Sequence, residues 1–441
     1  MVEVLQYICA GFRIISITFI NKPLITRTKS LLHKKMKCRI CKNNNLKKFL
    51  SLGKTPLANS FLSKKELNQK EKSFPLEICF CNNCKLVQLT HVVPGELMFK
   101  NYVYVSSTTN TFKQHFNKMA EDISNTFNLS KNSLVVDIGS NDGLLLRAFQ
   151  KFGARTIGIE PATNVARIAE QNGVETINDF FSENSVKKII SRRGNAGIIT
   201  AANVFAHVNN LDEFIGNVKK LLKKDGIFVI EVQYFADTIE KMTFDNIYHE
   251  HLSYFTLTPL IYFFKRHGME VFNAQRVASH GGSLRVFIKN AGSKYEIDGA
   301  VKEALVYENK LGINDFELYK QFADKVYIAR EKLVSLLKRI KREGKSIAGY
   351  GAPAKGNTLL NFCKIGTDYI GYIVDDNPLK IGLYTPGMHI SVVSSEVLDE
   401  KKPDYILILA WNFAEEILSK TKKYSDAGVK FIIPLPEPVV I

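Results

Sequence analysis

The sequence predicts an α/β protein with a small cysteine-rich N-terminal module, a central doubly wound parallel sheet and a second, smaller Rossmann-like unit. Two C-x-x-C pairs lie near the N-terminus, strand and helix patterns alternate from 134 to 232, and strand patterns return from 346 to 436. Such alternation is typical of parallel sheets with helices on their faces. A chain of 441 residues has room for two or three domains.

Residues 1–35 form an extension of uncertain role. The stretch VEVLQYICAGFRIISITFI is apolar, but three polar residues interrupt it and no basic segment precedes it. Met36 directly precedes the first cysteine pair, so we interpret 1–35 as an upstream extension, with a membrane anchor or an amphipathic surface helix as alternatives. No other stretch could span a bilayer. We therefore expect a cytoplasmic protein without a membrane span.

Residues 36–105 are predicted to form a zinc-binding module. Five of the seven cysteines gather there, and without an export signal they indicate thiolate ligands in a reducing compartment. Two knuckles of C-x-x-C spacing can supply four thiolates to a tetrahedral zinc ion, which leaves no position for water and makes the zinc structural. Cys79 is a fifth thiol with the wrong spacing. The predicted zinc ligands are Cys38, Cys41, Cys81 and Cys84.

Residues 106–298 are predicted to hold the central sheet, which a helical segment at 106–130 precedes. Ligands of open α/β sheets bind beyond the carboxyl ends of the strands, so the residues that follow each strand are the candidates for function. Strands are expected at 134–138, 156–160, 174–177, 197–204 and 227–232, with helices from about 143 and at 162–171, 184–190 and 212–223.

The loop VVDIGSNDGLLL at 135–146 predicts a binding site for S-adenosylmethionine and hence a class I methyltransferase sheet. It lacks the third glycine of G-x-G-x-x-G and matches the acidic-x-Gly-x-x-x-Gly loop of S-adenosylmethionine enzymes better. A carboxylate at the next strand end can accept both ribose hydroxyls. The predicted cofactor-binding residues are Asp137, Gly139, Asn141, Gly143, Glu160, Asp179, Phe180 and Asn203.

The segment FDNIYHEHLSYFTL at 244–257 follows the fifth strand and should lie above the carboxyl edge of the sheet, near His207. Its histidines are two residues apart, so they lack the spacing of a helical zinc site. An extended segment would point His249 and His251 the same way, whereas a turn could bring three of the four YHEH residues into one pocket.

The chemistry of this segment favours proton transfer. A histidine near its ordinary pKa of about 6.5 suits removal of an acidic C–H proton. The tyrosine, Tyr248, can hydrogen-bond an enolate oxygen, and the carboxylate of Glu250 can orient the imidazole.

Residues 299–441 are predicted to form a helical connector and the second Rossmann-like unit. Helix is expected over 299–342, and strands at 346–351, 369–376, 405–411 and 430–436. The loop GYGAPAKGN, with Asp375 at the next strand end, can be a degenerate nucleotide-binding loop in which Lys355 meets a diphosphate. The alternative is a tight strand-to-helix turn with a surface lysine.

Taken together, the motifs resemble those of the zinc-containing, S-adenosylmethionine-dependent sugar C-methyltransferases that act on nucleotide-linked keto-deoxysugars. The resemblance runs from about Met36 to the C-terminus. It is carried by CKLVQL, YVYVSS, DIGSNDGLLL, NVFAHV, YHEHLSYF and GYGAPAKGNTLLN with VDDNPLKIGLYTPG.

This resemblance implies a chain of three parts, a zinc module, a methyltransferase domain and a C-terminal Rossmann-like domain, with a sugar nucleotide held between them. It also implies a role for each matching residue. His251 would be the general base, with Tyr248 and Glu250 around it and His207 near the sugar. A tyrosine of NYVYVSS would face the same pocket, for which we prefer Tyr102 to Tyr104.

The expected reaction is methylation of a carbon next to the C4 ketone of the sugar, with C3 as the preferred position. The ketone acidifies that C–H bond, a base removes the proton, and the carbanion takes the methyl group. Alternatives are O- or N-methylation of a sugar and an NAD-dependent nucleotide-sugar enzyme. The net charge of +17 comes from scattered lysines without interleaved aromatic residues, so no nucleic-acid partner is expected.

Overall fold

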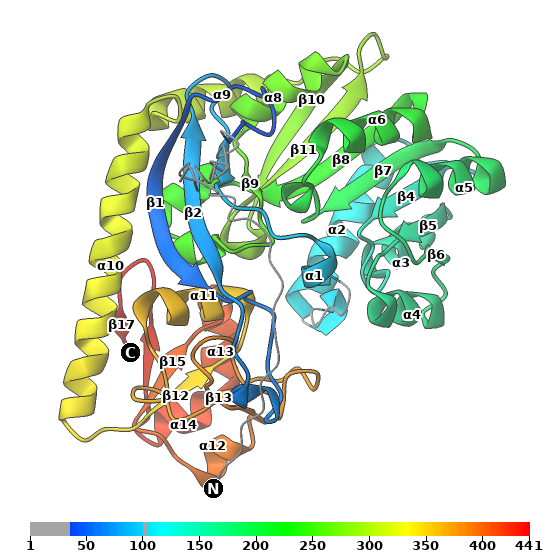
Figure 1. The fold of residues 1–441 in the computed structure, drawn as a ribbon. Coiled ribbons are helices and arrows are strands. Elements are labelled where there is room, and N and C mark those ends of the chain that lie inside the picture. The colour runs from blue at the N-terminus through cyan, green and yellow to red at the C-terminus, as the bar shows by residue number, and fades with distance from the viewer. Residues whose placement is uncertain (1–35, 100–104, 109) are drawn as a thin grey trace, which may run out of the picture. The chain divides into compact units, whose positions relative to one another are not determined.

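The computed structural model describes every residue from 36 onward except 100–104 and 109. The N-terminal extension and the predicted pocket tyrosines, Tyr102 and Tyr104, therefore lie outside the described residues. The described strands form three sheets (Figure 1). The predicted α/β class, with a central Rossmann-like sheet and a further sheet at the C-terminal end, is confirmed.

The N-terminal sheet is antiparallel and carries the cysteine pairs at one end. Its fourth strand comes from far along the chain: Ser253 and Tyr254, which begin two residues after YHEH, pair with Gln88 and Val87. The zinc module and the central part of the chain therefore share a sheet across the boundary predicted at residue 105. In order, the strands are β1 (Leu46–Thr55), β2 (Phe74–Cys81), β3 (Val87–Leu89) and β9 (Ser253–Tyr254).

The central sheet has five parallel strands and an antiparallel hairpin at one edge. The parallel strands lie close to the predicted positions, whereas the hairpin, β10 and β11, was not predicted. In order, the strands are β10 (Met269–Val277), β11 (Ser283–Asn290), β8 (Leu222–Gln233), β7 (Ala196–Ala202), β4 (Leu134–Ile138), β5 (Arg155–Ile159) and β6 (Thr176–Ile177).

Helices cover both faces of the central sheet because alternate residues of its strands point to opposite sides. Val135 of β4 joins a core with α2 and α3, while Val136 joins another core with α5 and α6. The helices of this part are α2 (Asn110–Thr126), α3 (Leu144–Gln150), α4 (Thr163–Gln171), α5 (Glu183–Arg193), α6 (Leu211–Leu221), α7 (Phe235–Glu240) and α8 (Leu257–Arg266), and a short helix α1 (Glu96–Phe99) precedes them.

The connector, predicted as one helical stretch, is two helices, α9 (Gly299–Leu311) and α10 (Phe316–Arg342). Gly312 ends α9 with a φ of +86°, a left-handed conformation that favours glycine and stops the helix. Tyr319 of α10 packs its ring 4.5 Å from that of Phe80, so the connector covers the N-terminal sheet (Figure 1). Among the described helices, none is long and apolar enough to cross a membrane.

The C-terminal sheet is parallel except for its last strand, and helices α11 (Ala354–Cys363), α12 (Val397–Glu400), α13 (Ala414–Lys420) and α14 (Lys422–Asp426) accompany it. The short strand β14 was not predicted. In order, the strands are β14 (Val392–Val393), β13 (Ile373–Val374), β12 (Ile347–Tyr350), β15 (Tyr405–Ile408), β16 (Lys430–Ile433) and β17 (Val439–Val440).

Candidate active site and metal centre

Four cysteine sulfur atoms meet at one end of the N-terminal sheet. All four lie within 4.8 Å of one another, with Cys38 Sγ 3.4 Å from Cys84 Sγ and Cys41 Sγ 3.5 Å from Cys81 Sγ. A tetrahedral zinc ion with Zn–S bonds of about 2.3 Å needs sulfur atoms about 3.8 Å apart, so the cluster fits zinc. Cys79 is buried but is not a member of the cluster, as its spacing predicted.

The two knuckles have matching turns. Lys42 N donates to Cys38 O at 3.0 Å and Lys85 N donates to Cys81 O at 2.9 Å. Both lysines adopt a positive φ, of 60° and 67°, directly after their knuckles. The chain thus folds the same way around each half of the metal site.

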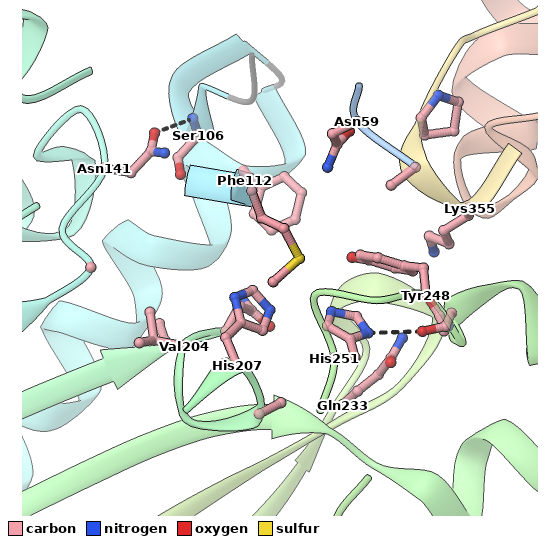
Figure 2. A pocket seen from close by; sticks show the side chains of 18 of the residues that line it. Asn59, Ser106, Phe112, Asn141, Val204, His207, Gln233, Tyr248, His251 and Lys355 are labelled. Atoms are coloured by element: carbon pink, nitrogen blue, oxygen red, sulfur yellow. Dashed lines mark hydrogen bonds between the residues drawn. The ribbon is translucent and has the colours of Figure 1, made fainter. Parts of the chain in front are cut away.

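A cavity of about 830 Å³ lies at the carboxyl edge of the central sheet (Figure 2). Residues from the N-terminal, central and C-terminal parts of the chain line its wall. Its lining includes Glu160 and His207 of the central part, Asn59 from the segment between β1 and β2, and Lys355 of α11. The strand-end rule therefore predicted the right edge of the sheet.

The two predicted glycines of the cofactor loop are needed for the loop itself. Gly139 has a φ of +67°, and a Cβ there would lie 2.4 Å from Val204 Cγ2. Gly143 has a φ of +76°, and a Cβ there would lie 2.7 Å from Val174 Cγ2. Any side chain at either position would strain the backbone and force the neighbouring valine to move.

The carboxylate of Glu160 holds this loop from the end of β5. Its oxygens accept hydrogen bonds from Asn141 N at 2.9 Å and Ala162 N at 2.8 Å. Burial raises the pKa of Glu160, and these two hydrogen bonds oppose that rise. Glu160 and Asn141 line the cavity, together with Gly139 and Asn203.

Three of the predicted cofactor-binding residues do not line the cavity, as far as the structure describes it. Asp137 is buried beneath the loop, where it accepts a hydrogen bond of 2.6 Å from Thr200; burial raises its pKa to about 7, which the Thr200 bond opposes. Asp179 accepts from the amide of Phe180, and it is Phe180 that lines the cavity, 45% exposed. Gly143 also lies off the wall, at the start of α3.

The YHEH segment forms a turn, in which His251 N donates to Tyr248 O at 3.0 Å. The turn places the Tyr248 and His251 rings 4.1 Å apart on the cavity wall, and the His207 ring lies 5.1 Å from that of His251 (Figure 2). His249 points into a separate small pocket beside Asn357, with its Nε2 3.3 Å from Phe74 O. The structure thus separates the two histidines that the sequence left as rivals.

A main-chain carbonyl orients His251. Its Nδ1 lies 2.8 Å from Asn246 O, which can only accept, so Nδ1 carries the proton and Nε2 keeps its lone pair. We expected Glu250 to orient the ring. Its Oε1 instead accepts a hydrogen bond of 2.6 Å from Asn59. The carboxylate therefore ties the turn to the segment after β1.

We expected the pKa of His251 to lie near its ordinary value, but the structure shifts it. Burial lowers it to about 4; the hydrogen bond to Asn246 opposes this shift, and the charge of Lys355 adds to it. The ring is therefore neutral at physiological pH. Burial also lowers the pKa of His249 to about 4, so position rather than pKa distinguishes the two imidazoles.

Several cavity residues were not predicted. Gln233 ends β8, and its buried Oε1 has no hydrogen-bond partner among the described residues, so the strand-end rule could have found it. Val204 follows β7, so the same rule could have found it too, whereas Asn59, Ser106 and Phe112 come from segments before the central sheet, which no local pattern relates to it. The unpredicted wall residues labelled in Figure 2 are Asn59, Ser106, Phe112, Val204 and Gln233.

The C-terminal loop GYGAPAKGN also reaches the cavity. Asp375 Oδ2 accepts a hydrogen bond of 2.6 Å from Ala352 N, and Gly351 has a φ of +81° at a point where a Cβ would lie 2.7 Å from Ala410 Cβ. The glycine and the carboxylate therefore shape the loop itself. Lys355 is only 8% exposed, which excludes the alternative of a surface lysine.

Comparisons with known proteins divide the chain in three. The family model described as "Putative zinc binding domain" matches residues 38–99, one described as "Methyltransferase domain" matches 112–273, and one described as "C-methyltransferase C-terminal domain" matches 278–436. The chain is 37% identical over 404 residues to C-methyltransferase NovU of Streptomyces niveus, which covers 92% of this chain and 96% of NovU.

More distant similarities are confined to part of the chain. Ubiquinone biosynthesis O-methyltransferase of Rhodopseudomonas palustris (strain BisA53) is 33% identical over 97 residues, 22% of this chain and 38% of that protein. The solved structure of magnesium protoporphyrin IX methyltransferase (ChlM) from Synechocystis PCC 6803 with bound SAM covers 43% of this chain and 88% of its own, with 11% identity and a TM-score of 0.33.

Proposed function

The chain belongs to the C-methyltransferase family and is an S-adenosylmethionine-dependent methyltransferase with a structural zinc site; from this premise we propose that it methylates a nucleotide-diphospho 4-keto-deoxysugar. The acceptor is the carbon next to the ketone, C3. One observation carries the proposal: His251 offers an oriented, neutral imidazole to a cavity that also contains the cofactor loop.

S-adenosylmethionine, when bound, supplies a methyl group on a positively charged sulfur. The residues that would hold it are those that line the cavity at the strand ends. Glu160 fits a ribose, because a carboxylate has about four acceptor sites and the main chain takes two of them here. Phe180 offers an exposed ring for the adenine. The cofactor residues on the wall are Gly139, Asn141, Glu160, Phe180 and Asn203.

The base is His251 Nε2. It takes the proton from the carbon next to the ketone, and the Nδ1 bond to Asn246 stabilises the imidazolium that forms. Tyr248, whose ring centre lies 4.1 Å from that of the base, donates to the ketone oxygen as negative charge develops there. His207 contacts the sugar from the segment after β7, and Glu250 holds the turn through Asn59. Tyr102 is proposed for the same pocket on the family resemblance alone.

Exchange of the α-hydrogen tests this function directly. Incubation in deuterated water with a nucleoside-diphosphate-linked 4-keto-6-deoxysugar should replace the C3 hydrogen, because the base must remove it. The matching sugar with a C4 hydroxyl should not exchange, because its C3–H bond is not acidic. If the protein were an O- or N-methyltransferase, neither sugar should exchange this hydrogen. If it were an NAD-dependent enzyme, it should bind nicotinamide.

Replacing Glu160 with alanine should weaken S-adenosylmethionine binding by about 10–100-fold, because charge-assisted hydrogen bonds worth about 1.5–3 kcal/mol are lost. Calorimetry measures the change, and Glu170→Ala on the exposed side of α4 is a matched control. An unchanged dissociation constant in Glu160→Ala would refute this cofactor assignment.

The pH dependence of kcat/KM should reflect the low pKa of His251. A base must be unprotonated, and a pKa of about 4 leaves His251 unprotonated from pH 8 down to about 5. An imidazole at its ordinary pKa of about 6.5 would instead lose about three quarters of its activity at pH 6. We expect kcat/KM to stay level between pH 8 and pH 6, measured on protein that remains folded. An inflection near pH 6.5 would contradict the assignment.

A further inference from the structure

A buried lysine on the cavity wall belongs to a network that joins the C-terminal sheet to the base segment. Lys355 Nζ lies 5.5 Å from the centre of the Trp411 ring. Trp411 Nε1 donates a hydrogen bond of 2.6 Å to Asp245 Oδ2, and Asp245 is fully buried in the 3₁₀ turn η4 (Phe244–Asn246). The start of α11, a residue after β15 and the segment before YHEH therefore meet at one point.

The network supports a positive charge in a place where charge is costly. Burial lowers the pKa of Lys355, and the charge of Asp245 opposes that shift. Burial likewise raises the pKa of Asp245, and the charge of Lys355 and the bond from Trp411 oppose it. A buried ammonium persists when an opposite charge and an aromatic face compensate for its lost hydration. Asp245 and Trp411 supply both.

This charge lies beside the catalytic residues. Figure 2 shows Lys355 on the same side of the cavity as Tyr248 and His251. Asp245 immediately precedes Asn246, whose carbonyl holds the His251 ring. One short segment thus carries the counter-charge of the lysine and the acceptor that orients the base.

The surroundings fit an anion with a single charge better than a diphosphate. Two further lysines on the C-terminal wall have acidic partners: Lys380 lies 3.5 Å from Asp375, and Lys420 lies 2.6 Å from Asp376. These two lysines therefore add little excess positive charge to that of Lys355, too little for a group with two negative charges. Proton removal next to a ketone creates one negative charge, on the oxygen bonded to the neighbouring carbon, within a few ångströms of the base.

We propose that Lys355 is a catalytic residue that binds the ketone oxygen of the substrate and stabilises the enolate. The C–H bond breaks, its proton moves to His251 Nε2, and its electron pair forms the enolate, whose oxygen faces the ammonium of Lys355. Lys355 donates a hydrogen bond and no net proton. Asp245 and Trp411 are positioning residues that keep the ammonium charged and aimed. The inference rests on the proposed function, because it needs a ketone in the substrate.

The test is the rate of α-hydrogen exchange in deuterated water for Lys355→Met, with a saturating nucleoside-diphosphate-linked 4-keto-6-deoxysugar and no methyl donor. Removal of one oxyanion donor typically costs about 10²–10³-fold in rate, so we expect a loss of that size. Binding of the free nucleoside diphosphate should change by less than about 3-fold. Wild-type exchange at saturation would overturn the inference, and weaker nucleoside diphosphate binding would then assign Lys355 to the diphosphate.

Two further variants keep the result interpretable. Lys364→Met, at the exposed opposite end of α11, should exchange at the wild-type rate. Lys355→Met leaves Asp245 without its counter-charge, so the double variant with Asp245→Asn removes both charges and should show the same loss. Trp411 is the only tryptophan in the sequence, so its fluorescence reports whether the network keeps its folded environment.

The wild-type protein separates this inference from the function beneath it. If the wild type fails to exchange the α-hydrogen of any keto-sugar, the proposed function falls and this role of Lys355 falls with it. If the wild type exchanges and Lys355→Met exchanges equally fast, only the inference is overturned.

Discussion

Replacement of His251 by asparagine should abolish both methyl transfer and exchange of the α-hydrogen, while affinity for S-adenosylmethionine stays nearly intact. General base catalysis contributes about 10²–10⁴-fold to a rate, and asparagine has no basic nitrogen. Asparagine can still donate to the Asn246 carbonyl that holds Nδ1 in the wild type, so the turn should survive. Exchange measured by NMR in deuterated water isolates the proton step from methyl transfer.

His249→Asn is the matched control. The residue lies two positions away in the same turn, its pKa is also lowered to about 4, but it faces the small pocket behind the turn. We expect this variant, where folded, to exchange the α-hydrogen at close to the wild-type rate. If His251→Asn exchanged at the wild-type rate instead, the base would lie elsewhere, and His207 on the same cavity wall would be the next candidate.

Replacement of Cys81 by serine should remove the zinc and cost the protein its solubility or fold. The wild type should contain one zinc ion per chain, since four sulfur atoms surround a single point. Structural zinc contributes an apparent binding free energy of about 10–16 kcal/mol in small zinc modules, and loss of one thiolate forfeits much of it. Metal analysis and soluble yield measure the effect.

Loss of the zinc ion should disturb the active site as well. Cys81 ends β2 at the sheet that also holds β9, and β9 begins two residues after His251. Cys79→Ser, on the same strand but outside the sulfur cluster, should retain its zinc. The metal assignment would be contradicted by freshly prepared wild-type protein without zinc, or by Cys81→Ser protein that still contains one zinc ion per chain.

Local patterns were enough for the parallel strands of the central sheet and for the metal site. Alternation of apolar strands and amphipathic helices located five strands of the central sheet, and C-x-x-C spacing selected the four cysteines of the cluster from the five in residues 36–105. The strand-end rule named the correct edge and four cavity residues of the cofactor loop region, together with Phe180. These features succeed because each depends on residues close together in the sequence.

The failures involve contacts between distant segments. Pairing of β9 with β3 joins Tyr254 to Val87, and no pattern within either segment specifies that register. The bond from Asn59 to Glu250 and the burial of Lys355 likewise arise only when separate parts of the chain meet. The ordinary pKa assumed for His251 was wrong because desolvation depends on the completed cavity.

The position of the transferred methyl group tests the central claim most directly. S-adenosylmethionine with a ¹³C-labelled methyl group should be incubated with the protein and a nucleoside-diphosphate-linked 4-keto-6-deoxysugar, and the product examined by NMR. We expect one-bond carbon–carbon coupling between the labelled methyl and C3, next to the ketone. A label bonded to a sugar oxygen or nitrogen, with the α-carbon unchanged, would contradict C-methylation through an enolate.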